Sequence, residues 1–146
     1  MPVIDHVGFA VKNVDQKKEL MEKLLGFRFL ERKVYERPGN TARLDFYEAQ
    51  GGVVELVEMS NPEAPVNKFI ASKGESLHHV CIRVEDIRAA MAGWEAKGVK
   101  FTIKPPLYGS RNGLITFADP STTGGLAVEL VQYLKAGEPV PDWAQK

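Results

Sequence analysis

The chain has 146 residues, a length that suits one domain or two half-domains sharing a core, and it can bury about two thirds of its unfolded surface. Nineteen basic residues balance nineteen acidic ones, so net charge attracts neither nucleic acid nor an anionic membrane to the whole surface. The one cysteine, Cys81, excludes an intramolecular disulfide and fits a reducing compartment. With no signal-like opening and no apolar run of spanning length, we expect a cytoplasmic protein without a membrane partner.

The first half of the chain begins with an alternating apolar strand at residues 3–12. Asn13 and Gln16 resemble a capping box that opens a helix, and Gly26 ends that helix. The predicted apolar face of the helix consists of Val14, Leu20, Met21, Leu24 and Leu25. Strands are then expected at residues 27–37, 41–49 and 53–59, so the first half has the order strand, helix, strand, strand, strand.

A connector with a short helix around residues 66–72 leads to a second pattern of the same kind, which starts at Leu77. We expect a helix from Asp86 to Lys97, followed by strands at 100–104, 113–118 and 126–133. The loop 104–112 is long enough to cover a cleft. Beyond Tyr133 the composition changes to proline, glycine and charge, which predicts a tail docked by Trp143 at most.

The two halves repeat one another. The run around His79 aligns with the run around His6, and Glu129 then aligns with Glu55 at nearly the same spacing. Each repeat therefore begins with a histidine and ends with a glutamate, which indicates an internal duplication. We predict a first module at 1–60, a connector at 61–76, a second module at 77–134 and a tail at 135–146, which together form one domain over 3–133.

Two imidazoles and two carboxylates suit a divalent first-row metal ion, namely Co, Ni, Mn, Zn or Fe, with positions left open for water or substrate. A single histidine or glutamate on a strand more often faces solvent or bonds locally. Glu55 and Glu129, however, each lie within an apolar run, where an ionised carboxylate is costly without a cation. His78 is out of phase with His79 and is interpreted as structural or exposed, and Cys81 as a buried thiol.

These residues resemble the vicinal oxygen chelate superfamily, which includes glyoxalase I, the extradiol dioxygenases and the bleomycin and fosfomycin resistance proteins. Within it the chain is most similar to the methylmalonyl-CoA epimerases. The likeness covers roughly Val3 to Tyr133. It is carried by Ile4-Asp5-His6-Val7-Gly8, by Ser60-Asn61-Pro62 through Lys68-Phe69-Ile70, by Gly74-Glu75-Ser76-Leu77-His78-His79-Val80-Cys81 with Val84-Glu85-Asp86-Ile87, and by Gly124-Gly125-Leu126-Ala127-Val128-Glu129-Leu130.

The resemblance implies an α+β fold in which two βαβββ modules form an open, cupped, mixed β-sheet around a metal site, usually in a homodimer. It places the metal ligands at His6, Glu55, His79 and Glu129. Epimerases often carry glutamine at the second of these positions, whereas glutamate is the glyoxalase I choice. At the place where bacterial epimerases commonly carry a glutamate base, this chain has Leu44.

The implied activity is that of a metal-dependent epimerase that removes the proton alpha to an acyl-CoA thioester carbonyl through a metal-bound enolate. Glu129 or Glu55 is the expected catalytic base, with Asp45 or Glu48 in reserve. Ser110 and Arg111 are candidates for binding the acyl carboxylate or the CoA phosphates.

Two alternatives remain open at this stage. A lactoylglutathione lyase of the glyoxalase I type would use the same four ligands on a thiol adduct. A drug-binding resistance protein would sequester its ligand without turnover, and such proteins generally lack the metal set.

Overall fold

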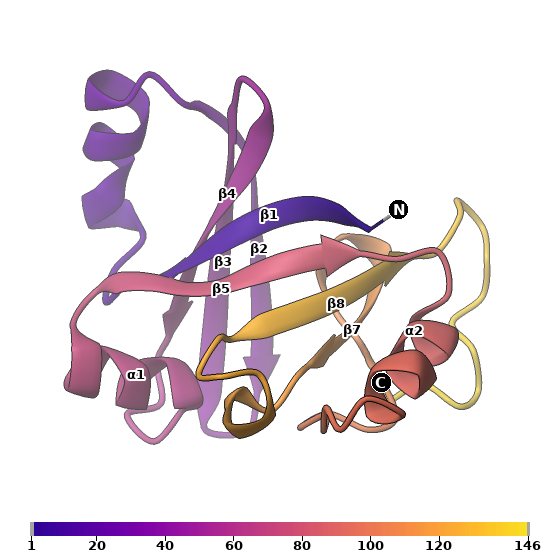
Figure 1. The fold of residues 1–146 in the computed structure, drawn as a ribbon. Helices are drawn as coiled ribbons and strands as arrows, with labels where there is room; N and C mark the ends of the chain where they lie inside the picture. Colours follow the sequence, from indigo (N-terminus) through magenta and orange to yellow (C-terminus); the bar gives the residue numbers. More distant parts are fainter. Residues whose placement is uncertain (1, 146) are drawn as a thin grey trace. The chain divides into compact units, whose positions relative to one another are not determined.

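The structure is a computed structural model that describes residues 2–145, and these residues pack as two compact units (Figure 1). The N-terminal unit comprises residues 6–78. The C-terminal unit comprises residues 79–145 together with residues 2–5. Each unit contains one four-stranded mixed sheet with helical segments packed against it.

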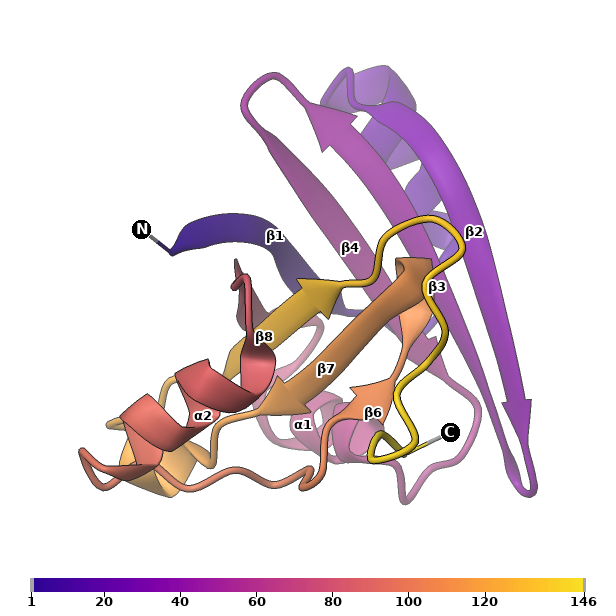
Figure 2. The same cartoon turned by 90° about the vertical axis from the view of Figure 1, so that its right-hand side faces the viewer.

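The sheet of the N-terminal unit has the strand order β2-β3-β4-β1. Its strands are the larger part of β1 (Val3–Ala10), from His6 onward, with β2 (Arg28–Arg37), β3 (Asn40–Ala49) and β4 (Gly52–Met59). β1 runs parallel to β4, and the other neighbours are antiparallel (Figure 2). All four strands were expected from the alternation of apolar residues, and the β2–β3 turn uses Gly39 at a φ of 75°, which glycine adopts without strain.

The segment between β1 and β2 is helical but irregular. Asn13 Oδ1 accepts a hydrogen bond from the Gln16 amide at 3.1 Å, as a cap should, and Gly26 ends the segment at a φ of 69°. Between these ends lie a 3-10 turn, η1 (Asp15–Lys17), and a π-type turn, η2 (Leu20–Leu24). The expectation of a regular helix is therefore wrong in its geometry.

The apolar face expected for this segment is buried only in part. Val14 and Met21 point toward the sheet and are buried, as expected. Leu20, Leu24 and Leu25 are 41%, 76% and 49% exposed, because the π-type turn shifts their directions relative to a 3.6-residue repeat.

Helix α1 (Pro65–Lys73) follows β4 and confirms the short helix expected in the connector. Its buried residues Val66 and Ile70 pack with Ala10 of β1 and Val57 of β4. Proline at the first helical position suits the helix start, because its missing N–H would have no partner there.

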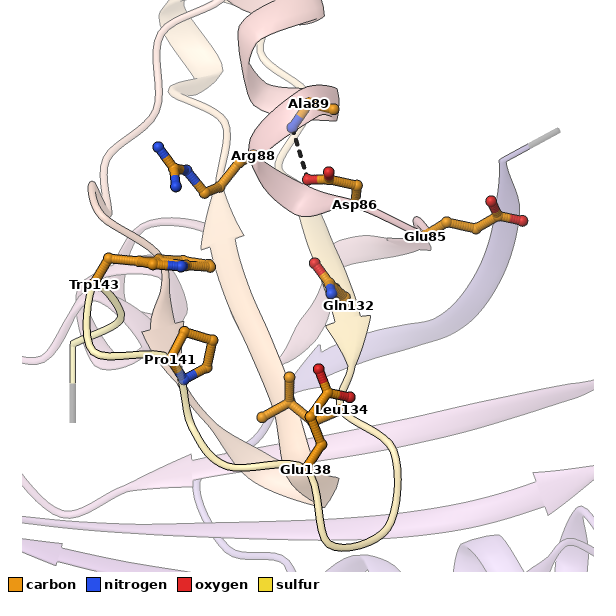
Figure 3. A pocket seen from close by; sticks show the side chains of 9 residues that line it. All are labelled: Glu85, Asp86, Arg88, Ala89, Gln132, Leu134, Glu138, Pro141 and Trp143. Carbon is orange, nitrogen blue, oxygen red and sulfur yellow. Dashed lines mark hydrogen bonds between the residues drawn. The ribbon is translucent and has the colours of Figure 1, made fainter.

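The sheet of the C-terminal unit has the order β5-β8-β7-β6, with β5 parallel to β8. Its strands are the larger part of β5 (Ser76–Arg83), from His79 onward, with β6 (Leu107–Tyr108), β7 (Gly113–Phe117) and β8 (Val128–Tyr133). Helix α2 (Ile87–Glu95) packs against β7 and β8 through Ile87, Leu114 and Leu130 (Figure 2). Asp86 caps α2 by accepting a hydrogen bond from the Ala89 amide at 2.9 Å (Figure 3).

The strand expected at residues 100–104 is wrong. Phe101 makes one isolated bridge to Ala118, and Thr102 bonds to Phe117 through its amide and its hydroxyl. The short β6 lies instead inside the stretch expected to be a loop, where Leu107 pairs with Ile115. The second module thus keeps three strands after its helix, with the first of them shifted along the chain.

The C-terminal tail is docked by Trp143, as expected. The Arg88 guanidinium lies 5.2 Å from the centre of the Trp143 ring, and both residues line a cavity of about 590 Å³ beside α2 (Figure 3). The Gln145 amide donates to the Pro106 carbonyl at 2.9 Å, which fastens the end of the tail to the stretch before β6. None of the helices within residues 2–145 has the length and apolar character needed to cross a membrane.

Candidate metal centre

In the N-terminal unit, His6 on β1 and Glu55 on β4 form a buried pair. Gly8 is the register partner of Glu55 on these parallel strands, so His6 lies one side-chain step away on the same face. His6 Nε2 is 3.5 Å from Glu55 Oε2. The two side chains are only 7% exposed, although each carries strongly hydrated groups.

The C-terminal unit repeats this arrangement. Cys81 of β5 is the register partner of Glu129 on β8, and His79 again lies one side-chain step before it. His79 Nε2 is 3.2 Å from Glu129 Oε2, and both residues are buried. The duplication inferred from sequence is therefore present as a repeated histidine-glutamate pair, one in each unit.

The spacing within each pair fits a metal ligand set. Ligand atoms bound at about 2.0–2.2 Å to one ion, with angles of 90–110°, lie about 3.0–3.5 Å from one another. The two pairs show 3.5 Å and 3.2 Å, which is longer than the 2.7–2.9 Å of a strong charge-assisted hydrogen bond. Buried imidazole nitrogen and carboxylate oxygen together are donors that first-row divalent ions accept. That both pairs hold the same ion stays a prediction.

A phenylalanine accompanies each pair, and these two residues were not found from the sequence. Phe46 of β3 lies edge-to-face with His6, at 6.3 Å between ring centres, and Phe117 of β7 lies likewise with His79 at 5.4 Å. Phe46 is the register partner of Glu55, as Phe117 is of Glu129. The signal was available, because both phenylalanines precede their glutamates in matching strands of the repeat.

The predicted substrate-binding residues lie in a turn of the C-terminal unit. Ser110 and Arg111 belong to the 3-10 turn η3 (Ser110–Asn112) just before β7, and both are partly buried. Arg111 has a φ of 56°, a region that non-glycine residues enter rarely, and its guanidinium lies 5.7 Å from the centre of the Tyr133 ring. Their binding role stays a prediction.

His78 and Cys81 behave as the sequence indicated. His78 lies edge-to-face with Phe69 of α1, with 4.9 Å between ring centres, which is a packing role. The Cys81 thiol is fully buried.

Asp45, one of the reserve candidates for the base, is held in an ion pair. Its carboxylate accepts two hydrogen bonds from the Arg32 guanidinium, at 2.5 and 2.8 Å, and is 1% exposed. Arg32 also bonds to Asp15 at 2.7 Å, and this hydrogen bond lowers the pKa of the Asp15 carboxyl. The direction of alternation on β3 turns Asp45 away from Phe46 and His6, so Asp45 is a structural residue.

Tyr47 is a buried residue on the same side of β3 as Asp45. Its hydroxyl meets no hydrogen-bond partner among residues 2–145. Burial, together with the nearby Asp45 charge, raises the pKa of the Tyr47 phenol to about 12. This hydroxyl therefore stays neutral and cannot act as a base near neutral pH.

Comparison with known proteins identifies the class. A model of the glyoxalase/bleomycin resistance protein/dioxygenase superfamily matches residues 5–117, and the chain belongs to this superfamily. Members typically bind a divalent metal ion, and this chain carries candidate ligands of the matching types. The predicted glyoxalase-like α+β fold class is confirmed.

Three individual proteins of known sequence or structure are similar to this chain over most of its length. The chain is 27% identical to the uncharacterized protein YqjC of Bacillus subtilis over 129 residues, which is 88% of this chain and 91% of that protein. It is 26% identical to the mouse mitochondrial methylmalonyl-CoA epimerase over 130 residues, with 88% of this chain and 72% of the epimerase covered. The structure of a Streptomyces coelicolor methylmalonyl-CoA epimerase variant in complex with 2-nitronate-propionyl-CoA superposes with a TM-score of 0.80. That protein is 31% identical, and the match covers 94% of this chain and 97% of that chain.

Proposed function

We propose that this protein is a metal-dependent epimerase that moves the proton alpha to the thioester carbonyl of an acyl-CoA of the methylmalonyl type. The observation that carries the proposal is the histidine-glutamate pair repeated in both units with the same register. The similarity to methylmalonyl-CoA epimerases, one of them solved with an acyl-CoA analogue, supports the substrate class.

In this proposal His6, Glu55, His79 and Glu129 hold one divalent ion. When bound, the ion supplies Lewis-acid stabilisation of the negative charge that develops on the acyl oxygens. The imidazoles contribute Nε2, the atom that faces the glutamate in each pair. Apolar surroundings keep water from the carboxylates, which strengthens their interaction with a cation.

Glu129 and Glu55 are the proposed groups that move the proton. Each lies in a half of the duplicated site, so two carboxylates are available for removal and return of a proton. Leu44 carries no ionisable group, and Asp45 is occupied by Arg32, so neither of these β3 residues supplies the base.

Ser110 and Arg111 are proposed to contact the anionic parts of the substrate. The η3 turn is rigidly held, because Asn112 accepts a hydrogen bond from the Tyr108 hydroxyl and donates one to the Leu134 carbonyl, each at 2.9 Å. A fixed turn that presents a guanidinium suits recognition of a carboxylate or phosphate. We also propose a homodimer, as the resemblance implies.

The test is incubation of the metal-loaded protein with methylmalonyl-CoA in heavy water. We expect deuterium to enter the alpha carbon without net loss of substrate, followed by mass spectrometry or proton NMR. Absence of exchange under conditions in which a known epimerase exchanges fully would overturn the proposal.

Matched variants show which carboxylates act. Glu129→Gln and Glu55→Gln each remove one proposed proton carrier, and at least one should slow exchange by about 100-fold to 10,000-fold. Glu85→Gln is the control, because Glu85 is an exposed carboxylate just before α2. If all three variants exchange at the wild-type rate, the assignment of the base is wrong.

A lactoylglutathione lyase is the second candidate, and Glu55 is the observation that favours it. With one carboxylate in each half, two bases are available to a hemithioacetal. The proton that a lyase moves in such a substrate is also alpha to a carbonyl group. Methylglyoxal with glutathione separates the two activities, because only the lyase yields a thioester that absorbs in the ultraviolet.

A further inference from the structure

Each buried histidine-glutamate pair has a phenylalanine as its third member. Phe46 and His6 have an interplanar angle of 88°, and Phe117 and His79 have one of 79°. Both contacts are edge-to-face, and their ring-centre distances fall within the 4.5–7 Å range that aromatic pairs prefer. Each contact lies within a single unit.

The strand register gives each phenylalanine a second neighbour, the glutamate. Phe46 lies opposite Glu55 on antiparallel strands, and Phe117 lies opposite Glu129. Side chains directly opposite one another on one face have Cβ atoms about 4.5–5.5 Å apart. One ring therefore borders both the imidazole and the carboxylate of its pair.

This position restricts the torsion that decides where the imidazole points. The χ2 torsion of histidine is broad and roughly two-fold, so a free imidazole can swing Nε2 away from a ligand position. A phenylalanine fixed by its own strand blocks much of that rotation. Phe46 is 1% exposed and Phe117 is partly buried, so neither ring can move aside easily.

The third histidine provides a natural contrast. His78 also lies edge-to-face with a phenylalanine, Phe69, at an interplanar angle of 82°. Phe69, however, belongs to α1 and has no glutamate opposite it on a neighbouring strand. All three histidines thus have an edge-to-face contact with a phenylalanine. For His6 and His79 that phenylalanine also lies opposite the glutamate of the pair on a neighbouring strand.

We propose that Phe46 and Phe117 are positioning residues, which hold Nε2 of His6 and His79 toward the carboxylates of Glu55 and Glu129. The proposal rests on the metal site of the proposed function. It adds that the geometry of each half of the site is set before the ion binds.

The first test uses the metal-free protein. The three histidines give separate Hε1 signals in an NMR spectrum, and a neighbouring ring shifts them. Phe46→Leu should move the His6 signal, Phe117→Leu the His79 signal and Phe69→Leu the His78 signal, while Phe46→Tyr and Phe117→Tyr leave the ring effect in place. Unmoved His6 and His79 signals would overturn the proposed contacts, whatever the protein catalyses.

The second test is titration with Co²⁺, followed by its absorption spectrum. Phe46→Leu and Phe117→Leu should each weaken affinity by about threefold to tenfold, the size of one aromatic contact, and Tyr variants should restore it. The double variant should lose roughly the product of the two factors. Phe69→Leu, the matched control, should bind Co²⁺ as the wild type does.

The outcomes separate this inference from the proposed function. Wild-type affinity and an unchanged Co²⁺ spectrum in both leucine variants would overturn the positioning role and leave the proposed metal site intact. Failure of the wild type to bind Co²⁺ would overturn the metal site itself. Melting curves in the presence of a chelator check that each variant folds, and Phe46→Met replaces Phe46→Leu if the latter does not.

Discussion

In the N-terminal unit the sheet face opposite His6 is covered by the irregular segment 15–24, whereas in the C-terminal unit the equivalent face is covered by the regular helix α2. A cavity of about 420 Å³ remains under the irregular segment, lined mainly by Phe9, Val11, Leu20, Met21, Val54 and Leu56. In the C-terminal unit Trp94 and Phe101 complete the packing around Ile87 and Leu130.

The sheet faces that carry His6 and His79 are alike. Both carry histidine, glutamate and phenylalanine at matching register positions, with similar distances. The two repeats therefore share the geometry of the candidate site and differ in how their helical segments fill the space on the other face of the sheet. The same strand register in both repeats is enough to produce the same site geometry, because register determines which side chains are neighbours.

The comparison predicts the largest effect for the histidines. His6→Ala and His79→Ala should each weaken the affinity for Co²⁺ by roughly 1,000-fold, a decade beyond the 10–100-fold loss typical of residues that only orient ligands. Competition with a chromophoric chelator measures this. His78→Ala is the control. A large loss in one variant and none in the other would break the equivalence of the two halves.

The difference in packing between the two units predicts different losses of stability when an equivalent leucine is truncated in each. Leu130 and Leu56 follow Glu129 and Glu55 directly, and both are buried. Leu130→Ala should lower the free energy of unfolding by about 4 kcal/mol, whereas Leu56→Ala should lower it by about 2 kcal/mol, because Leu56 already borders a cavity and has fewer contacts to lose. Urea denaturation measures both values. A larger loss for Leu56→Ala would contradict the packing comparison.

The helix caps give a smaller contrast. Asp86→Ala removes the cap of a regular α-helix and should cost about 1 kcal/mol. Asn13→Ala removes the longer cap bond of a single 3-10 turn and should cost about 0.5 kcal/mol, the low end of cap values. Thermal unfolding of both variants in chelator tests the order, and equal costs would argue against it.

Tyr47→Phe is predicted to stabilise the N-terminal unit. The substitution removes a buried hydroxyl without a partner among residues 2–145, and it keeps the ring that packs edge-to-face with Phe29. The free energy of unfolding should rise by about 1 kcal/mol, the lower end of the cost of an unsatisfied buried group. A loss of stability on denaturation would show that the hydroxyl is engaged.

Acid should loosen the irregular segment before it loosens α2. The Glu75 carboxylate accepts hydrogen bonds from the Lys12 amide and the Lys17 ammonium, and the first of these lowers the pKa of Glu75 below its ordinary value of 4.5. Because the pKa is lowered on folding, this stabilisation is present above about pH 4.5 and disappears as the pH falls through the folded value. The protection factors for amide hydrogen exchange at residues 12–17, which correct for the pH dependence of the intrinsic exchange rate, should therefore fall as the pH drops below about 4.5.

Glu75→Gln is the control for this pH effect. The variant should show low protection factors at residues 12–17 at every pH, without a further decrease in acid. Equal acid responses in residues 12–17 and in α2 would contradict a local cause.

Sequence alone could predict most of the strands and the face on which each candidate ligand lies, because both depend on strict alternation. His6, Glu55, His79 and Glu129 lie on strands where a period of two fixes the face of every residue. The same rule placed His78 on the face opposite His79. Asp45 was kept as a reserve base, and its ion pair with Arg32 was not predicted. The nearly constant spacing between the two repeats then paired His6 with His79 and Glu55 with Glu129.

The failures occur where backbone geometry departs from a regular period. The π-type turn at Leu20–Leu24 has i→i+5 hydrogen bonds, such as that from the Leu25 amide to the Leu20 carbonyl, which residue types do not announce. At residues 100–104, the Thr102 amide and the Lys100 carbonyl keep backbone hydrogen bonds to Phe117 and Asp119, but other bonds come from the hydroxyls of Thr102 and Thr116, so no regular strand forms. Phe46 and Phe117 could not be recognised as members of the site because phenylalanine carries no atom that binds a metal ion.

Whether the two histidine-glutamate pairs share one ion can be decided from the metal content of the purified chain, loaded with Co²⁺, dialysed and measured by elemental analysis against protein concentration. Two histidine-glutamate pairs acting on one ion predict one equivalent per chain in the wild type and almost none in either His6→Ala or His79→Ala. Two equivalents in the wild type, with one retained in each variant, would mean that each unit binds its own ion and would contradict the account.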